Sequence, residues 1–146
     1  MEETDKKTVG AVIVSHGRLA NELLAAAETV IGDLENIVAV SIGWHDDVEA
    51  AKDEIERAIK SVSRGGGVIL MTDMFGGTPT NISAMFLEEG RVEIVTGVNL
   101  PMVVRFATHS KPAGLSEIAQ EIEEQGRQSI YRTSSLFAPA KSKKDA

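Results

Sequence analysis

Cysteine is absent from this chain of 146 residues, which excludes disulfide bonds and thiolate metal sites. No apolar run is long enough to span a bilayer, and the polar start, residues 2–7, is unlike a signal peptide. Aromatic residues make up only 4% of the chain, and the formal net charge of −7 comes with no basic stripe, which argues against nucleic-acid binding. We therefore expect a cytoplasmic protein that reaches a membrane, if at all, only through a partner.

What the chain does contain is a regular alternation of two hydrophobic periods. Short apolar runs, typical of buried strands, are found at 9–14, 36–42, 68–72 and 92–95. Helical spacing of apolar residues is found between them, at 19–31 and 48–62, from 79 to near 90, from 100, and at 116–125. Strands that alternate with helices predict an α/β domain with a doubly wound, mainly parallel sheet in the order 2-1-3-4 and helices on both faces.

The domain boundaries follow from the same pattern. We expect one domain over residues 9–133, with flexible polar tails at 1–8 and 134–146. Ser116 is the expected cap of the last long helix, and Gly126 is its expected stop. Residues 129–133 are expected to form one last short strand.

Two ionisable residues follow directly on expected strands. His16 comes after the first strand and Asp73 after the third. If these strands are neighbours, an imidazole and a carboxylate meet at the carboxyl edge of the sheet, where open α/β sheets bind ligands. Gly76 and Gly77 follow Asp73 as a turn, with Thr78 as the expected N-cap of a helix and proline at its first position.

This arrangement suits a histidine that carries a phosphoryl group. A neutral imidazole is a nucleophile near pH 7, and a carboxylate bonded to one ring nitrogen leaves the lone pair of the other free. The backbone N–H groups of Gly76 and Gly77 and the hydroxyl of Thr78 are expected to hold the phosphoryl oxygens. The scheme requires no metal and no cofactor. Taken singly, His16, Asp73 and the glycine turn can each have a purely structural role, and only their coincidence indicates a site.

The remaining candidates have ordinary structural roles. His45 and His109 are expected at the surface, and Trp44 is expected to pack over a loop or to line the mouth of the site. Asn99 follows the fourth strand as a turn residue, with contact to the site as the alternative.

Three segments together resemble the enzyme IIA domain of the mannose family of the bacterial sugar phosphotransferase system. They are Ile13–Gly17, Asp73–Asn81 and Gly97–Met102, and the similarity covers roughly residues 8–133. The resemblance implies that His16 accepts phosphate from the phosphocarrier protein HPr and passes it to a IIB protein. It also implies that Asp73 orients the ring, and that the turn with Thr78, a position where the family often has serine, holds the phosphoryl group.

The resemblance carries two further expectations about assembly. The family domain is a homodimer in which a C-terminal strand crosses to the partner's sheet, and Ser129–Thr133 would be that strand here. Family subunits often continue through a linker into a IIB domain, whereas this sequence stops after a short tail with three lysines. The IIB partner is therefore expected to be a separate protein.

Three alternatives remain open at this point. A histidine phosphatase also uses a His-Gly at a strand end, but it requires arginine where Ser15 stands, and no clear second catalytic histidine follows. A tetrapyrrole metal chelatase would use the histidine and the acid as metal contacts, but it leaves the Gly-Gly-Thr-Pro turn unexplained. A regulatory sensor of the same fold would also use a phosphorylated His16, so the sequence does not separate it from a transport component.

Overall fold

Strands and helices alternate along the whole described part of the chain, which in this computed structural model comprises residues 7–43, 47–109 and 112–137. The strands are β1 (Thr8–His16), β2 (Ile37–Ile42), β3 (Gly65–Thr72) and β4 (Val92–Thr96). The helices are α1 (Leu19–Ile31), α2 (Val48–Val62), α3 (Gly77–Ser83), the 3₁₀-helix η2 (Ala84–Phe86), α4 (Leu100–Thr108), α5 (Leu115–Gln128) and α6 (Thr133–Phe137). All four strands pair in parallel in the order β2-β1-β3-β4, which confirms the predicted doubly wound fold.

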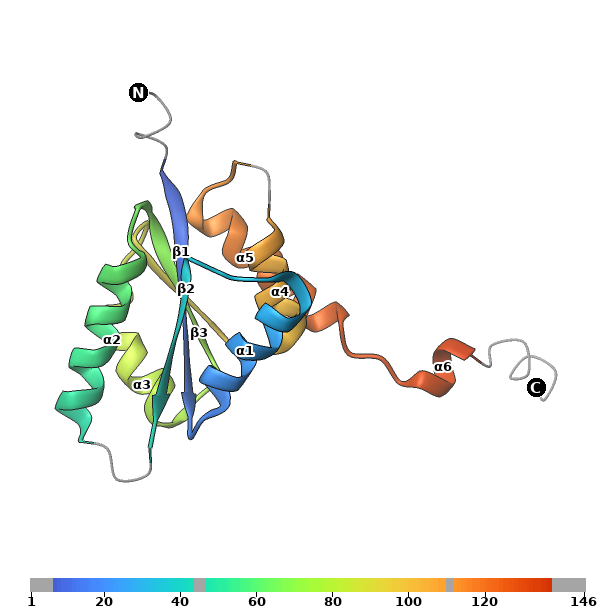
Figure 1. Ribbon diagram of the computed structural model, residues 1–146, viewed down its shortest axis with the longest axis horizontal. Helices are drawn as coiled ribbons and strands as arrows, with labels where there is room; N and C mark the ends of the chain where they lie inside the picture. The colour runs from blue at the N-terminus through green and yellow to red at the C-terminus, as the bar shows by residue number, and fades with distance from the viewer. Residues whose placement is uncertain (1–6, 44–46, 110–111, 138–146) are drawn as a thin grey trace.

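The sheet separates two apolar cores. On one face α1, α4 and α5 cover it around Ile13 and Ile69; on the other α2 and α3 cover it around Val12 and Leu70 (Figure 1). These four side chains alternate along β1 and β3, and all are fully buried. Because successive residues of a strand point to opposite faces, a central strand with a layer of helices on each side requires an uninterrupted apolar run. Burial of each such side chain contributes about 2 kcal/mol.

The register of the central strands brings the two candidate residues together. Val14 of β1 pairs with Thr72 of β3, so His16 and Asp73 follow the paired positions at the same edge of the sheet. Crossovers between parallel strands return the chain to the opposite edge each time, and all four carboxyl ends therefore meet at this one (Figure 1). The candidate site lies at the switch point between β1 and β3, as predicted.

The start of α3 differs from the prediction by two residues. The helix begins at Gly77, with Gly76 in the N-cap position, so Thr78 and Pro79 lie inside its first turn. The first N–H groups of a helix have no partner within it, and proline is therefore tolerated throughout the first turn. The helix also ends early: Ser83 is its last residue, and a 3₁₀ turn replaces the expected continuation towards residue 90.

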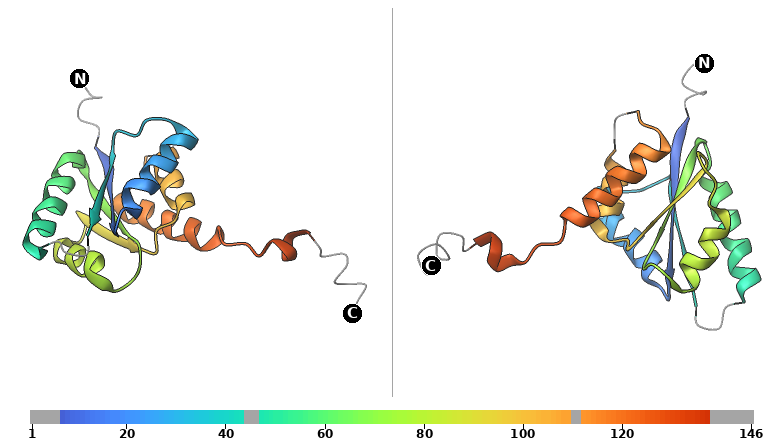
Figure 2. Two further views of the ribbon diagram at one scale, coloured as in Figure 1. Left: turned by 60° about the horizontal axis from the view of Figure 1, so that its bottom comes forward. Right: turned by 180° about the vertical axis from the view of Figure 1, so that it is seen from behind.

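Two predictions about the ends of α5 were wrong, whereas the strand expected at 129–133, which would pair with a second copy, stays a prediction. The chain after α5 forms no strand in this single copy, because residues 129–132 lie outside any helix or strand and Thr133 begins α6. A strand needs an edge to pair with, and this segment extends away from its own sheet (Figures 1 and 2). Gly126 does not stop α5 but is buried within the helix. It packs so close to α4 that an added Cβ would lie 2.6 Å from Met102 Sδ. The cap is Gly114 rather than Ser116.

The expected tails fall largely outside the described residues. Of the N-terminal tail, residues 1–6 lie outside, and Thr8 already belongs to β1. Of the C-terminal tail, residues 138–146 lie outside, and residues 134–137 belong to α6. Trp44 and His45 also lie outside the described part of the chain.

Candidate functional site

His16 and Asp73 form a hydrogen-bonded pair at the end of the two central strands. The Nδ1 atom of His16 lies 2.8 Å from Asp73 Oδ2, and the backbone N–H of His16 donates to the same oxygen at 2.9 Å. The carboxylate side chain is 11% exposed and the imidazole 50% exposed. A largely buried carboxylate that accepts from Nδ1–H fixes the tautomer, and it leaves the lone pair on Nε2 of a half-exposed ring.

A buried serine orders the segment that carries the histidine. Ser15 is fully buried at the end of β1, where its hydroxyl donates to the carbonyl of His16 at 3.0 Å and accepts from the N–H of Ala20 at 2.6 Å. The N–H of Gly17 donates to the carbonyl of Ile42 at 2.9 Å, which ties the same turn to β2. These bonds connect β1, β2 and α1 around the histidine and set the direction in which its ring leaves the sheet.

The glycine turn after Asp73 closes against the imidazole. Gly76 and Gly77 have φ of +86° and +85°, a left-handed region that side chains of L-residues rarely adopt. A Cβ added to Gly77 would lie 3.1 Å from Cε1 and 3.2 Å from Nε2 of His16. The backbone of Gly77 therefore faces the nitrogen that carries the free lone pair. Thr78 follows in the first turn of α3, on the exposed side.

The geometry brings three of the five predicted site residues together in space, and the other two flank Gly77 in the sequence. His16 bonds to Asp73, and Gly77 contacts the ring, with Gly76 directly before it. Thr78 directly follows Gly77 in the chain. Asn99 has a structural role: it caps α4 by accepting from the N–H of Met102, and its amide donates to the carbonyl of Gly126.

His109 was expected at the surface, and that prediction was wrong. Its side chain is 14% exposed, and its Nδ1 lies 3.3 Å from Glu121 Oε2, which Arg105 also contacts at 2.5 Å. Burial alone would raise the pKa of Glu121, but the hydrogen bond from His109 and the charge of the Arg105 guanidinium outweigh it and hold the pKa below its ordinary value of 4.5. The cluster joins α4 to α5, on the face of the sheet that α1, α4 and α5 cover. Spacing along the sequence gave no sign of it.

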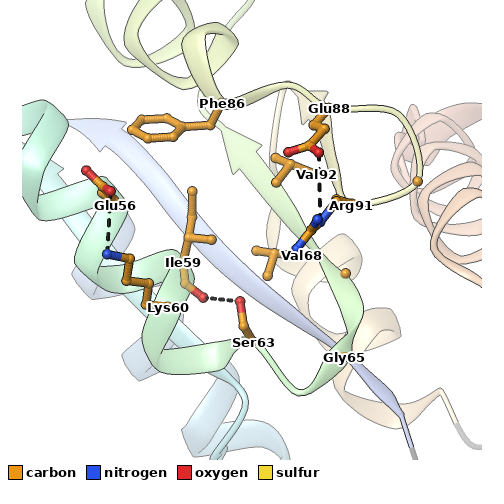
Figure 3. Close-up of a pocket in the computed structure, with 12 residues that line it drawn as sticks. Glu56, Ile59, Lys60, Ser63, Gly65, Val68, Phe86, Glu88, Arg91 and Val92 are labelled. Carbon is orange, nitrogen blue, oxygen red and sulfur yellow. Dashed lines mark hydrogen bonds and ion pairs between the residues drawn. The ribbon is translucent and has the colours of Figure 1, made fainter.

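A separate hollow of about 400 Å³ lies at the amino ends of β3 and β4 (Figure 3). Its floor is apolar, with Ile59, Val68 and Phe86. The charged side chains at its rim are arranged in pairs, Glu56 with Lys60 at 3.5 Å and Glu88 with Arg91 at 3.8 Å. The hollow is at the opposite end of the strands from His16.

Two kinds of feature are absent from the described ranges. Within them, no group of three or more His, Cys, Asp or Glu side chains is placed to hold a metal ion. Among the helices of the same ranges, none has both the length and the apolar character needed to cross a membrane.

Fold and site together define a class: a doubly wound α/β domain with an exposed histidine held by a largely buried carboxylate at the switch point. A family model agrees with it. The model EIIA-man, described as "PTS system fructose IIA component", matches residues 10–123. The chain belongs to this family, and it is a phosphotransfer component of the sugar phosphotransferase type, as the resemblance predicted.

Individual relatives support the assignment. The fructose-specific EIIA component of Bacillus subtilis (strain 168) is 25% identical over 123 residues, which cover 84% of each protein. The mannose-specific EIIAB component of Escherichia coli (strain K12) is 32% identical over 84% of this chain, which spans only 39% of the length of that protein. Among solved structures, the mannose/sorbose-specific IIA subunit from Enterococcus faecalis aligns with a TM-score of 0.76 at 25% identity, covering 86% of this chain and 94% of the other. The EIIA component from Streptococcus agalactiae, at 18% identity and a TM-score of 0.79, covers 88% of this chain and 99% of its own and shows the same fold.

Proposed function

We propose that His16 accepts a phosphoryl group on Nε2 from the phosphocarrier protein HPr and passes it to a separate IIB protein. The observation that carries this proposal is the bond between His16 Nδ1 and Asp73 Oδ2 at 2.8 Å, because it leaves the second ring nitrogen unprotonated and accessible. The transfer serves carbohydrate uptake or its regulation. Both roles use the same phosphorylated residue.

In the proposed step, the lone pair of His16 Nε2 attacks phosphorus as the bond from phosphorus to the donor's imidazole nitrogen breaks. The electron pair of the broken bond stays on the donor's ring. The acceptor ring then carries a positive charge, with its proton still on Nδ1, and the carboxylate of Asp73 stabilises that charge at 2.8 Å. Reversal of the same step towards a IIB protein restores the neutral ring.

The glycine turn supplies the proposed phosphoryl site. Gly77 faces Nε2, so a phosphoryl group on that nitrogen would lie against the backbone at the start of α3. Backbone N–H groups at such a position point towards an anion, and the positive end of the helix dipole favours it. In the proposal Gly76 and Gly77 donate from the backbone, and Thr78 donates from its exposed hydroxyl.

The surroundings of the site suit a protein as donor and acceptor. Met74 and Phe75 follow Asp73 directly, and their side chains are 54% and 85% exposed. Exposed apolar side chains next to a reacting group are typical of a surface that a protein partner covers during transfer.

We also propose that two copies pair through the segment 129–133. β4 is an edge strand whose residues are all half-buried, and a hollow of about 400 Å³ lies along it. Ile130 and Tyr131 are exposed to 79% and 65%, and they belong to the segment that follows α5 and leads away from the sheet (Figure 2). Pairing of this segment with β4 of a partner would give the segment a sheet edge and bury both side chains.

Labelled phosphoenolpyruvate tests the main proposal in a mixture of enzyme I, HPr and this protein. We expect an acid-labile label on the wild-type protein and none on His16→Ala at equal concentration. Circular dichroism of both proteins serves as the control for folding. The proposal fails if the wild type takes up no label while HPr in the same tube is phosphorylated. Release of free phosphate from a monoester would instead favour a histidine phosphatase.

A further inference from the structure

Buried hydroxyl groups gather around the turn that carries Asp73. In the described part of the chain, the buried polar residues are Ser15, Thr72, Thr80 and Ser83. A buried hydroxyl without a partner is unfavourable, so native structures almost always pair one. Thr72 and Thr80 meet this requirement through one another, although the first ends β3 and the second lies in α3.

The two hydroxyls form a directed chain of hydrogen bonds. Thr80 Oγ1 donates to the carbonyl of Met74 at 2.6 Å. Its single proton is used there, so in the 2.8 Å contact between the two hydroxyls Thr72 is the donor and Thr80 the acceptor. Thr80 therefore holds the residue on each side of Asp73 at once.

Asp73 depends on such support from the backbone. Its Oδ2 accepts both bonds from His16, whereas its Oδ1 is buried and has no hydrogen-bond partner. Since no bond to Oδ1 helps to fix the carboxylate, the two bonds between Oδ2 and His16 depend on where the backbone places residue 73. The backbone at this point is held through Thr80.

We propose that Thr80 is a positioning residue for transfer at His16, acting through Thr72 and Met74 to place the carboxylate of Asp73 against Nδ1. This inference rests on the proposed role of His16 as phosphoryl acceptor. The hydroxyl of Thr80 touches neither the imidazole nor the phosphoryl group. It fixes the distance of the pair, and with it the tautomer of the ring.

The chain offers a set of matched variants. Thr80→Val removes the hydroxyl at nearly constant shape, and Thr80→Ser keeps it. Ser83→Ala is the control, because Ser83 lies one turn further along α3 and its hydroxyl is fully buried without a partner. Transfer from phosphorylated HPr is followed in a single turnover, and the ring nitrogens and Nδ1 proton of His16 are followed by NMR. Thermal unfolding is recorded for each variant.

We expect Thr80→Val to slow transfer about ten-fold and to raise the population of the tautomer protonated on Nε2, with Thr80→Ser and Ser83→Ala within about two-fold of wild type. In an Asp73→Asn background, Thr80→Val should slow transfer no further, because its effect passes through that carboxylate. Thr72→Val interrupts the same chain from β3 and replaces Thr80→Val if the latter does not fold.

The outcomes separate this inference from the proposed function. If the folded Thr80→Val variant transfers at the wild-type rate while Asp73→Asn is slow, the positioning role is wrong and the proposed function stands. The positioning role is also wrong if Ser83→Ala loses as much transfer rate as Thr80→Val, or if Thr80→Val still slows transfer in the Asp73→Asn background. In either case Thr80 contributes only to general packing. Absence of any label on the wild-type protein refutes the proposed function itself.

Discussion

Gly77→Ala places a methyl group beside the nitrogen that is proposed to react. The added Cβ lies 3.2 Å from His16 Nε2 and 3.1 Å from Cε1, closer than the ordinary carbon contact of about 3.5–4.0 Å. Phosphorus must approach the nitrogen to about 3–3.5 Å before it can react, and the methyl group occupies part of that space. We expect the rate of transfer from HPr to fall about 10- to 100-fold.

The same substitution also strains the backbone, and this effect must be separated from the first. An L-residue at φ of +85° costs roughly 1–2 kcal/mol, which lowers the melting temperature of a chain of this size by about 2–8 °C. Gly90→Ala is the matched control. Its φ is +79°, no atom lies within 4 Å of its added Cβ, and it precedes β4 at the opposite end of the sheet.

Rapid-quench transfer and urea unfolding should be measured on both variants. We expect a similar loss of stability in the two proteins, with transfer impaired only in Gly77→Ala. Equal transfer rates in the two variants would refute the assignment of Nε2 as the reacting atom next to Gly77. Gly76 has φ of +86° and open space around an added Cβ, so the transfer rate of Gly76→Ala is expected to lie between those of the other two variants.

Three further predictions concern the pair, the helix cluster and the dimer. Asp73→Asn should leave the protein folded and slow transfer about 10- to 100-fold, because an amide that donates to Nδ1 favours the tautomer without a free Nε2 lone pair; unchanged kinetics would count against the carboxylate. Glu121→Gln should lower the free energy of unfolding by about 1 kcal/mol at pH 7. Because the folded-state pKa of Glu121 lies below its ordinary value of 4.5, this difference in stability is complete above pH 4.5 and disappears as the pH falls through the folded-state pKa. Urea titrations of both proteins at pH 7 and well below pH 4.5 check this, and a difference that persists at the lower pH would contradict it. Truncation after Gln128 should convert a dimer into a monomer in light scattering, and a truncated chain that stays dimeric would overturn the pairing of 129–133 with β4.

The fold followed from the sequence because its strands are buried on both faces. Uninterrupted apolar runs as short as those of β1 and β3 are typical of central parallel strands, and the alternation with helices leaves only a small number of topologies. The same reasoning placed His16 and Asp73 at one edge, since parallel strands bring their carboxyl ends together. Their contact at 2.8 Å was therefore predictable in kind, although not in distance.

The features that were missed depend on contacts between distant segments. Thr78 looks like an N-cap by residue type, but the helix already begins at Gly77, whose positive φ and close approach to the imidazole involve a distant strand. Pairing of Thr72 with Thr80 was invisible because threonine is ordinary in both a strand and a helix. His109 is largely covered where α5 brings Glu121 against the end of α4, a contact that local spacing does not encode.

The most direct test of the central claim is the NMR spectrum of the ¹⁵N-histidine-labelled protein after phosphorylation by HPr. We predict phosphorus on Nε2 of His16, with Nδ1 still protonated and its proton bonded to the carboxylate of Asp73. Phosphorus on Nδ1, or on another residue while His16 stays unmodified, would contradict that claim.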